Sequence, residues 1–143
     1  MNFDSDELLR LDNQLCFPLY AAARKMIGIY RPILKPLGIT YTQYIAFMVL
    51  WEQDDISVGE LGARLHLDNG TLTPLLKKME ASGYITRERR RDDERSVSIR
   101  LTQKGRDMKE KARGIPAQVG SCVDLPANKA ENLYSILYDF LAD

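Results

Sequence analysis

The 143-residue chain is long enough for one domain with a hydrophobic core, and its 20 basic and 20 acidic residues balance. This balance excludes a strong overall field, so binding to DNA or to a membrane would have to come from a local arrangement of charge. The longest apolar run is too short to span a bilayer, and the acidic start does not resemble a secretory signal. Two cysteines and one histidine predict neither a disulfide framework nor a metal site. We therefore expect a cytoplasmic protein with reduced thiols, no metal and no other cofactor.

The N-terminal part of the chain is expected to be helical. Apolar residues recur at helical spacing there, and Pro18 is tolerated only in the first turn of a helix. One solution begins the main helix near Cys16 or Phe17 and ends it near Pro32 or Pro36. The start of the main N-terminal helix therefore depends on where the chain breaks near Pro18.

A second helix follows a short connector over residues 38–40. Thr40 and Thr42 are both candidates for its N-cap. The segment Tyr41–Glu52 is apolar on most sides, so we expect a buried strut. Residues 53–55 form a polar link to the next helix.

A helix-turn-helix is expected after this link. Ser57 is a candidate N-cap for a short helix over Val58–Leu65, and His66 falls at the turn, where a structural or DNA-facing role outweighs catalysis. A second helix begins after Asp68, with its apolar residues on one face, and Gly83 can end it in a left-handed conformation. The opposite face is polar and carries Asn69, Thr71, Thr73, Lys77 and Lys78.

A two-stranded β-hairpin is expected next. Residues 84–90 can extend, residues 92–93 turn the chain, and apolar side chains alternate over residues 97–101 as in a half-buried strand. Asp93 and Arg95 lie two positions apart across the turn, close enough for an ion pair that holds the hairpin in shape. The hairpin cations expected to face DNA are Arg89, Arg90, Arg91 and Arg95.

These elements predict a mainly α fold with a small β-hairpin wing (α+β), a winged helix-turn-helix. The second helix fits a major groove about 12 Å wide, and the hairpin brings cations to the phosphates or the minor groove. The arginines could instead form a solvated edge that prevents strand aggregation, but their coincidence with a groove-sized helix favours binding to double-stranded DNA. We expect a single domain over residues 1–143, with residues of about 57–102 as its DNA-binding part.

The C-terminal part should be helical with interruptions. Thr102 opens a charged helix, glycines and a proline interrupt the segment that follows, and a last helix begins at Asp124 or Pro126. Helices at the two ends of a small winged-helix domain have little core of their own to cover. We therefore predict that residues of about 5–36 and 114–143 dimerise the protein as an isologous homodimer.

The chain resembles the MarR family of bacterial transcription regulators. Asp93-Glu94-Arg95 is similar to the Asp-x-Arg wing signature of that family, and residues 97–105 are similar to its strand-Leu-Thr-x-x-Gly exit. A closer similarity, covering nearly the whole chain, is to the organic hydroperoxide resistance regulators (OhrR). It is carried by residues 15–17, 19–22, 30–32, 37–41, 43–44 and 70–76, while Pro18 departs from the small residue expected there.

The resemblance implies a redox role for Cys16. A thiolate is favoured near the start of a helix, but a free cysteine is more often a small core residue, and spacing alone favours that interpretation. The resemblance reverses the balance and implies that Tyr30 and Tyr41 of the partner subunit donate to the Cys16 thiolate. It also implies that Cys122 is a resolving thiol, whereas a mechanism with an external thiol would leave Cys122 a bystander.

The resulting hypothesis is a homodimeric repressor that releases a pseudo-palindromic operator when an organic hydroperoxide oxidises Cys16. The alternative is a MarR-type repressor that responds to a small aromatic ligand without redox chemistry. A thiol peroxidase is a third possibility, but the sequence has no nucleophile elbow, P-loop or dinucleotide fingerprint. We therefore expect that the protein is not an enzyme and that it has no catalytic residue.

Overall fold

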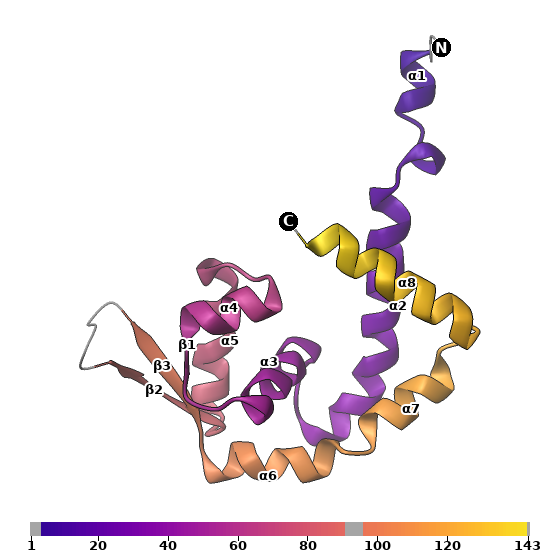
Figure 1. The fold of residues 1–143 in the computed structure, drawn as a ribbon. Coiled ribbons are helices and arrows are strands. Elements are labelled where there is room, and N and C mark those ends of the chain that lie inside the picture. The colour runs from indigo at the N-terminus through magenta and orange to yellow at the C-terminus, as the bar shows by residue number, and fades with distance from the viewer. Residues whose placement is uncertain (1–3, 91–95, 143) are drawn as a thin grey trace.

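The computed structural model describes residues 4–90 and 96–142 and shows a helical protein with a small sheet (Figure 1). The helices are α1 (Ser5–Leu8), α2 (Cys16–Leu34), α3 (Tyr41–Glu52), α4 (Val58–Leu65), α5 (Asn69–Ala81), α6 (Gln103–Ala112), α7 (Ile115–Cys122) and α8 (Ala127–Leu141). Two short 3-10 helices, η1 (Leu11–Asn13) and η2 (Lys35–Leu37), precede and follow α2. The strands are β1 (Ile56–Ser57), β2 (Ile85–Arg89) and β3 (Val97–Leu101).

Helix α2 begins at Cys16, which puts Pro18 in its first turn, as expected from the cost of proline in a helix interior. The chain leaves η2 through Gly38, whose φ of 70° is a left-handed conformation that glycine adopts readily. Thr40, rather than Thr42, then caps α3. Its hydroxyl accepts a hydrogen bond from the Gln43 backbone N–H, and the Gln43 side chain accepts one from the Thr40 N–H, which completes a capping box.

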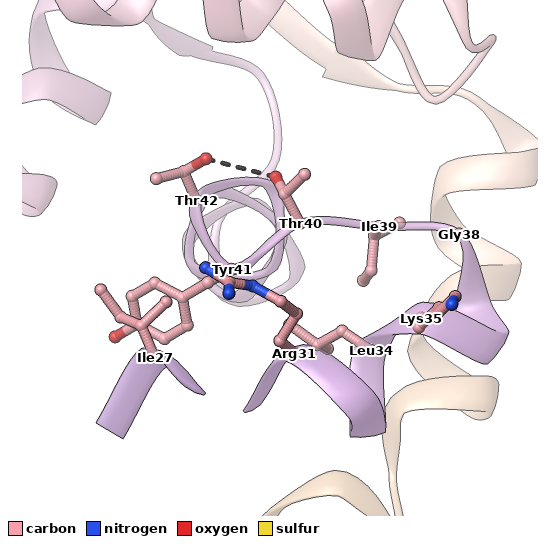
Figure 2. Close-up of a pocket in the computed structure, with 9 residues that line it drawn as sticks. All are labelled: Ile27, Arg31, Leu34, Lys35, Gly38, Ile39, Thr40, Tyr41 and Thr42. Atoms are coloured by element: carbon pink, nitrogen blue, oxygen red, sulfur yellow. Dashed lines mark hydrogen bonds between the residues drawn. The ribbon is translucent and has the colours of Figure 1, made fainter. Parts of the chain in front are cut away.

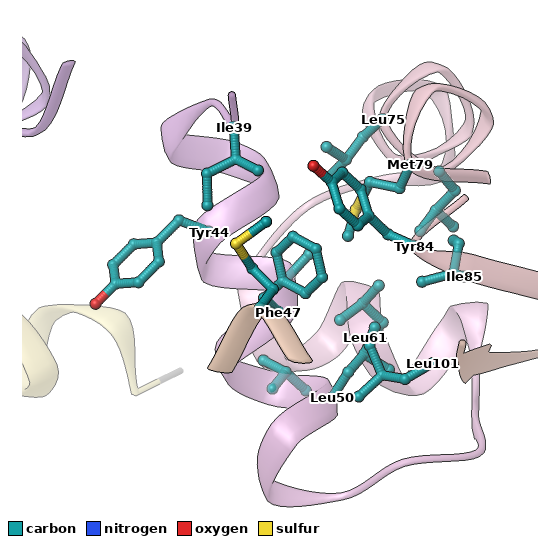
Figure 3. Packing of buried hydrophobic residues seen from close by; sticks show 14 of the residues in the cluster. Ile39, Tyr44, Phe47, Leu50, Leu61, Leu75, Met79, Tyr84, Ile85 and Leu101 are labelled. Atoms are coloured by element: carbon teal, nitrogen blue, oxygen red, sulfur yellow. The ribbon is translucent and has the colours of Figure 1, made fainter. Parts of the chain in front are cut away.

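Helix α3 is the buried strut that its composition predicts. Phe47 is fully buried, stacks on Trp51 at 5.2 Å and meets the Tyr84 ring edge-on at 5.1 Å between ring centroids. The Trp51 indole N–H donates to the Gly105 carbonyl at 3.0 Å, so α3 is also tied to α6. Figure 3 shows α3 side chains packed among residues from α4, α5 and the sheet. This core holds the DNA-binding elements in place.

Across residues 4–90 and 96–142 the sheet has three strands, so the prediction of a two-stranded hairpin was incomplete. Strand β3 is central and antiparallel to both neighbours, in the order β1–β3–β2. Strand β1 has only two residues, too few for an alternating pattern to be visible in the sequence. Beyond β1, the Asp54 carboxylate accepts the Leu101 backbone N–H at 2.9 Å, and Asp55 pairs with Arg100 at 3.2 Å. The polar link therefore holds the end of β3 that extends past the two residues of β1.

Helix α7 corrects the prediction of a loosely specified segment after α6. Its proline, Pro116, falls in the first turn, where its missing N–H costs nothing. Ile115 and Val119 are buried in the same core as Leu34 of α2. Tertiary packing therefore overrides the helix-weakening effect of Gly120.

The N-terminal and C-terminal helices are much less covered than the core. In Figure 1, α1 and η1 project beyond the body of the chain, and α8 overlaps α2 in this view. Within the described residues no single helix is long and apolar enough to cross a membrane, although α2 with η2 and α3, bent by 75°, pass together on length and composition alone.

Candidate nucleic-acid interface and cysteine site

The turn between α4 and α5 is tight and is built around Gly62. His66 ends α4 in a left-handed conformation, with φ at 54°, and the Leu67 N–H donates to the Gly62 carbonyl at 3.0 Å. A Cβ on Gly62 would lie 2.8 Å from the Leu67 carbonyl oxygen and 2.9 Å from Leu72 of α5. The His66 backbone therefore turns the chain at this point, and Gly62 permits the close approach of the two helices.

Helix α5 presents the predicted polar face. Asp68 caps it by accepting the Thr71 N–H at 2.8 Å, and this bond holds the pKa of the Asp68 carboxyl below its usual value. One hydroxyl on the polar face is engaged within the helix, because Thr73 donates to the Asn69 carbonyl at 2.8 Å. The structure leaves all five predicted residues exposed: Asn69, Thr71, Thr73, Lys77 and Lys78.

The wing carries only part of the predicted arginine cluster within the described residues. Arg89 at the end of β2 is exposed, and the N–H of the partly buried Arg90 donates to the Ser96 carbonyl at 2.8 Å, which extends the ladder beyond β2. The predicted contacts of Arg91 and Arg95, and the ion pair of Arg95 with Asp93, lie outside the described residues and stay predictions.

A link between α5 and the wing was not predicted from the sequence. Arg87 of β2 donates from its backbone N–H and from Nη2 to the two carboxylate oxygens of Glu80, each at 3.1 Å. The hydrogen bond from Arg87 also lowers the pKa of the Glu80 carboxyl. This clasp joins the last turn of α5 to the first part of the hairpin. It therefore fixes the angle between the two elements expected to touch DNA.

The two cysteines lie at the ends of two different helices, and both are free thiols. Cys16 is the first residue of α2, and Cys122 is the last residue of α7. Both side chains are exposed. Within one chain, Cys16 is therefore not a buried core side chain.

The predicted tyrosines lie together at the other end of α2. The rings of Tyr30 and Tyr41 are 5.0 Å apart between centroids, and Tyr44 lies 5.7 Å from Tyr30. Burial raises the pKa of all three hydroxyls, so each keeps its proton and can donate at neutral pH. Tyr30 follows Cys16 by 14 positions in α2, which is roughly 21 Å at about 1.5 Å per residue. One chain therefore does not bring the thiol to its predicted donors.

A cavity of about 540 Å³ lies beside these tyrosines, between α2 and the start of α3 (Figure 2). Ile27, Leu34, Ile39 and Tyr41 supply apolar surface. The cations Arg31 and Lys35 also line it, so the hollow combines an apolar lining with a basic rim.

The helix-turn-helix, the exposed polar face of α5 and the basic hairpin define a winged-helix DNA-binding transcription regulator. A family model described as transcriptional regulator SarA/Rot matches residues 28–112. The organic hydroperoxide resistance transcriptional regulator of Bacillus subtilis is 47% identical over 93% of this chain and 90% of its own length. The chain therefore belongs to the MarR-like family of transcriptional regulators that includes the organic hydroperoxide resistance regulators.

Solved structures of AbfR, a protein of Staphylococcus epidermidis, have the same fold. Reduced AbfR bound to DNA is 37% identical, with a TM-score of 0.78 over 95% of this chain and 94% of that one. Disulfide-formed AbfR is 36% identical, with a TM-score of 0.65 over 95% of this chain and 96% of that one. Membership of a family of regulators favours regulation over the peroxidase alternative.

Proposed function

We propose that this protein is a cytoplasmic, homodimeric repressor that releases its DNA operator when an organic hydroperoxide oxidises Cys16. The observation that carries the proposal is the geometry of α2. It exposes Cys16 at one end and holds the Tyr30–Tyr41 pair, with protonated hydroxyls, at the other. A second copy in antiparallel orientation brings each thiol to the tyrosines of its partner.

The exposed apolar faces of the terminal helices support a homodimer. Monomeric proteins rarely expose large contiguous apolar patches, so this surface calls for a partner, and a second copy is the simplest one. The residues concerned in α8 are Leu133, Tyr134, Ile136, Tyr138, Phe140 and Leu141, and those before and within α2 are Leu8, Leu9, Leu11, Leu15, Phe17, Tyr20 and Met26.

Two copies of α5 then read a pseudo-palindromic operator in double-stranded DNA. Their half-sites lie about 34–36 Å apart, one turn of the double helix. The exposed face of α5 enters the major groove, while Arg89 and Arg90 of the wing approach phosphates or the neighbouring minor groove. The global charge balance means that this local cluster provides the electrostatic attraction.

The sensing step is a thiolate displacement on a peroxide. The Cys16 sulfur attacks one oxygen of the hydroperoxide, the O–O bond breaks, and the other oxygen takes a proton and leaves in the alcohol. Cys16 becomes a sulfenic acid. The Cys122 sulfur then attacks the Cys16 sulfur, so a disulfide forms and water leaves. The tyrosine hydroxyls donate to the thiolate before the attack and orient it.

The disulfide supplies the conformational switch. It needs the two Cα atoms within about 7 Å of each other, and in one chain Cys16 and Cys122 end two different helices, both as free thiols. We propose the pairing between subunits, as the resemblance to the organic hydroperoxide resistance regulators implies. The likeness to AbfR supports a coupled change of shape. At nearly equal identity, the chain resembles the DNA-bound reduced form more closely than the disulfide form.

An operator-binding titration with and without cumene hydroperoxide tests the proposal. The wild-type protein should release DNA on oxidation and form a reductant-sensitive covalent dimer on non-reducing gels. Cys16→Ser should fold, bind DNA and stay bound, whereas Cys122→Ser should still be oxidised but overoxidise more readily and recover less fully. Release of DNA by oxidised Cys16→Ser, as readily as by wild type, would contradict the proposal.

A further inference from the structure

Charge is segregated along the first 42 residues. Residues 4–15 carry four acids and one base, whereas residues 16–42 carry four bases and no acid. The described residues contain no ion pair for any of these eight groups with the opposite sign. The acids are Asp4, Asp6, Glu7 and Asp12, and the bases of the second stretch are Arg24, Lys25, Arg31 and Lys35.

The acidic stretch, which we name the N-terminal arm (residues 4–15), has a defined shape. It consists of α1 and η1 and projects beyond the body of the chain (Figure 1). The Asn13 side chain donates to the Glu7 carbonyl at 2.8 Å, and the Gln14 side chain donates to the carbonyls of Leu8 and Arg10 at 2.6 and 2.8 Å. These bonds fold the arm back on itself. Its four leucines remain exposed, Leu9 at 82%.

The basic stretch forms a groove along α2. Tyr20, Arg24, Ile27 and Arg31 share one face of the helix, because they are spaced by three or four positions. Two hollows lie on this face, and Ile27 and Arg31 line both of them. The larger is the cavity of about 540 Å³ described above, which Lys35 and Tyr41 also line (Figure 2). The groove thus has an apolar floor and a basic rim, complementary to the leucines and acids of the arm.

We propose that the N-terminal arm of each copy docks into this groove of the second copy. The proposal rests on the homodimer proposed above, in which Cys16 lies beside the partner's Tyr30. Two antiparallel copies of α2 pair residues whose numbers have a constant sum, here 46. This register covers α2 alone, where Cys16 falls opposite position 30 of the partner. The arm directly precedes Cys16 and therefore lies next to the end of the partner's α2 that carries Arg31, Lys35 and the apolar floor. The position of the arm, its acidic charge and its exposed leucines all favour docking at this end of the partner's α2.

Docking of the arm completes the sensor site. Cys16 directly follows the arm, so an arm held in the groove fixes the position of the thiol against the tyrosines. The leucines of the arm would also cover the apolar hollow beside Tyr41, which shields the site from water. The arm therefore acts as a positioning element for Cys16.

Cross-linking in a protein without native thiols tests the contact. In a Cys16→Ser/Cys122→Ser background, Leu11→Cys combined with Lys35→Cys should give a covalent dimer under mild oxidation, since the proposal places the arm beside the end of α2 where Lys35 lies. The matched control combines Leu11→Cys with Lys109→Cys on α6 and should stay uncross-linked. Sedimentation is measured in parallel. A dimer without the cross-link would overturn the arm proposal alone, whereas a monomer would overturn the proposed homodimer as well.

A charge-reversal cycle supplies a second test, carried out without DNA or peroxide. Asp12→Lys and Lys35→Glu should each weaken dimerisation about fivefold at low salt, and the double variant should recover most of the loss. The effect should shrink in high salt. Losses that simply add in the double variant would overturn the proposal and leave the redox proposal intact, because that proposal is tested by DNA release.

Discussion

The two aromatic residues Phe47 and Phe140 show how differently the two regions of the molecule are completed. Phe47 of α3 is 0% exposed and lies in a core shared by the helix-turn-helix and the sheet, whereas Phe140 of α8 is 67% exposed. The DNA-binding region therefore builds its own core within one chain. The terminal region leaves apolar faces uncovered, which the proposed second copy would cover. Folding of the first region and assembly of the second should respond to different mutations.

The largest effect is expected from emptying the core of the DNA-binding region. Phe47→Ala removes a fully buried ring that contacts Trp51 and Tyr84, and it should lower the free energy of unfolding by about 3–5 kcal/mol. Urea denaturation of dilute protein measures the loss. Phe140→Ala is the matched control and should change it much less. Equal losses for the two variants would erase the distinction between the regions.

Assembly should fail without loss of the fold when charge is placed on the terminal region. Phe140→Asp should weaken the homodimer by at least tenfold, because burial of a large apolar side chain is worth about 1.5–3 kcal/mol. Sedimentation equilibrium measures this, and circular dichroism should show an unchanged helix content. Lys111→Asp on the exposed face of α6 is the control. A dimer as tight as wild type would contradict the role assigned to α8.

The helix-turn-helix should be sensitive to a single methyl group. Gly62→Ala places a Cβ against the Leu67 carbonyl and Leu72, and should cost about 1–3 kcal/mol of stability and weaken DNA binding. Gly120→Ala meets nothing within 4 Å and should be neutral or stabilise by up to about 1 kcal/mol. Thermal denaturation compares the two. A neutral Gly62→Ala would show that the turn is looser than described.

Contacts of α5 with phosphate should appear in the salt dependence of binding. Lys77→Ala should weaken operator binding and reduce the slope of log affinity against log salt by about one unit, while leaving stability unchanged. Lys109→Ala on α6 should leave the slope as in wild type. An unchanged slope for Lys77→Ala would remove this residue from the proposed interface.

The smallest effect concerns the clasp between α5 and the wing. The pKa of Glu80 is lowered in the folded chain, so its stabilising contribution is complete above the ordinary glutamate pKa and is lost as pH falls through the lowered value. Glu80→Gln should cost at most about 1 kcal/mol at neutral pH and flatten the acid side of the stability curve. DNA affinity should fall more than stability, because the wing loses its fixed angle. An unchanged acid limb would exclude Glu80 as its source.

The sequence predicted the elements whose signals are local. The caps at Thr40, Ser57 and Asp68, together with the apolar composition of α3 and the apolar faces of α4 and α5, located these three helices correctly. Strand β1 and helix α7 were missed because both depend on tertiary partners, β3 in one case and the core around Leu34 in the other. The helix and strand propensities of a segment do not depend on its tertiary partners, so they cannot predict these two elements.

The candidate site was predicted only where it follows from helix periodicity or from the family resemblance. The polar face of α5 follows from the first, and Cys16 with its tyrosines from the second. The Glu80–Arg87 clasp joins a helix to a strand across the turn between them, so neither helix nor strand periodicity predicts it. Nothing in the sequence distinguishes Arg87 from the other arginines of the hairpin, and its partner Glu80 is visible only in the fold.

Mixed dimers test most directly the claim that the sensor is assembled from two copies. A subunit with Cys16→Ser supplies intact tyrosines, and a subunit with Tyr30→Phe and Tyr41→Phe supplies an intact Cys16. The heterodimer then contains one complete site. Its Cys16 should be oxidised by cumene hydroperoxide as fast as in wild type, and faster than in the tyrosine-variant homodimer. Oxidation in the heterodimer as slow as in that homodimer would contradict a site shared between subunits.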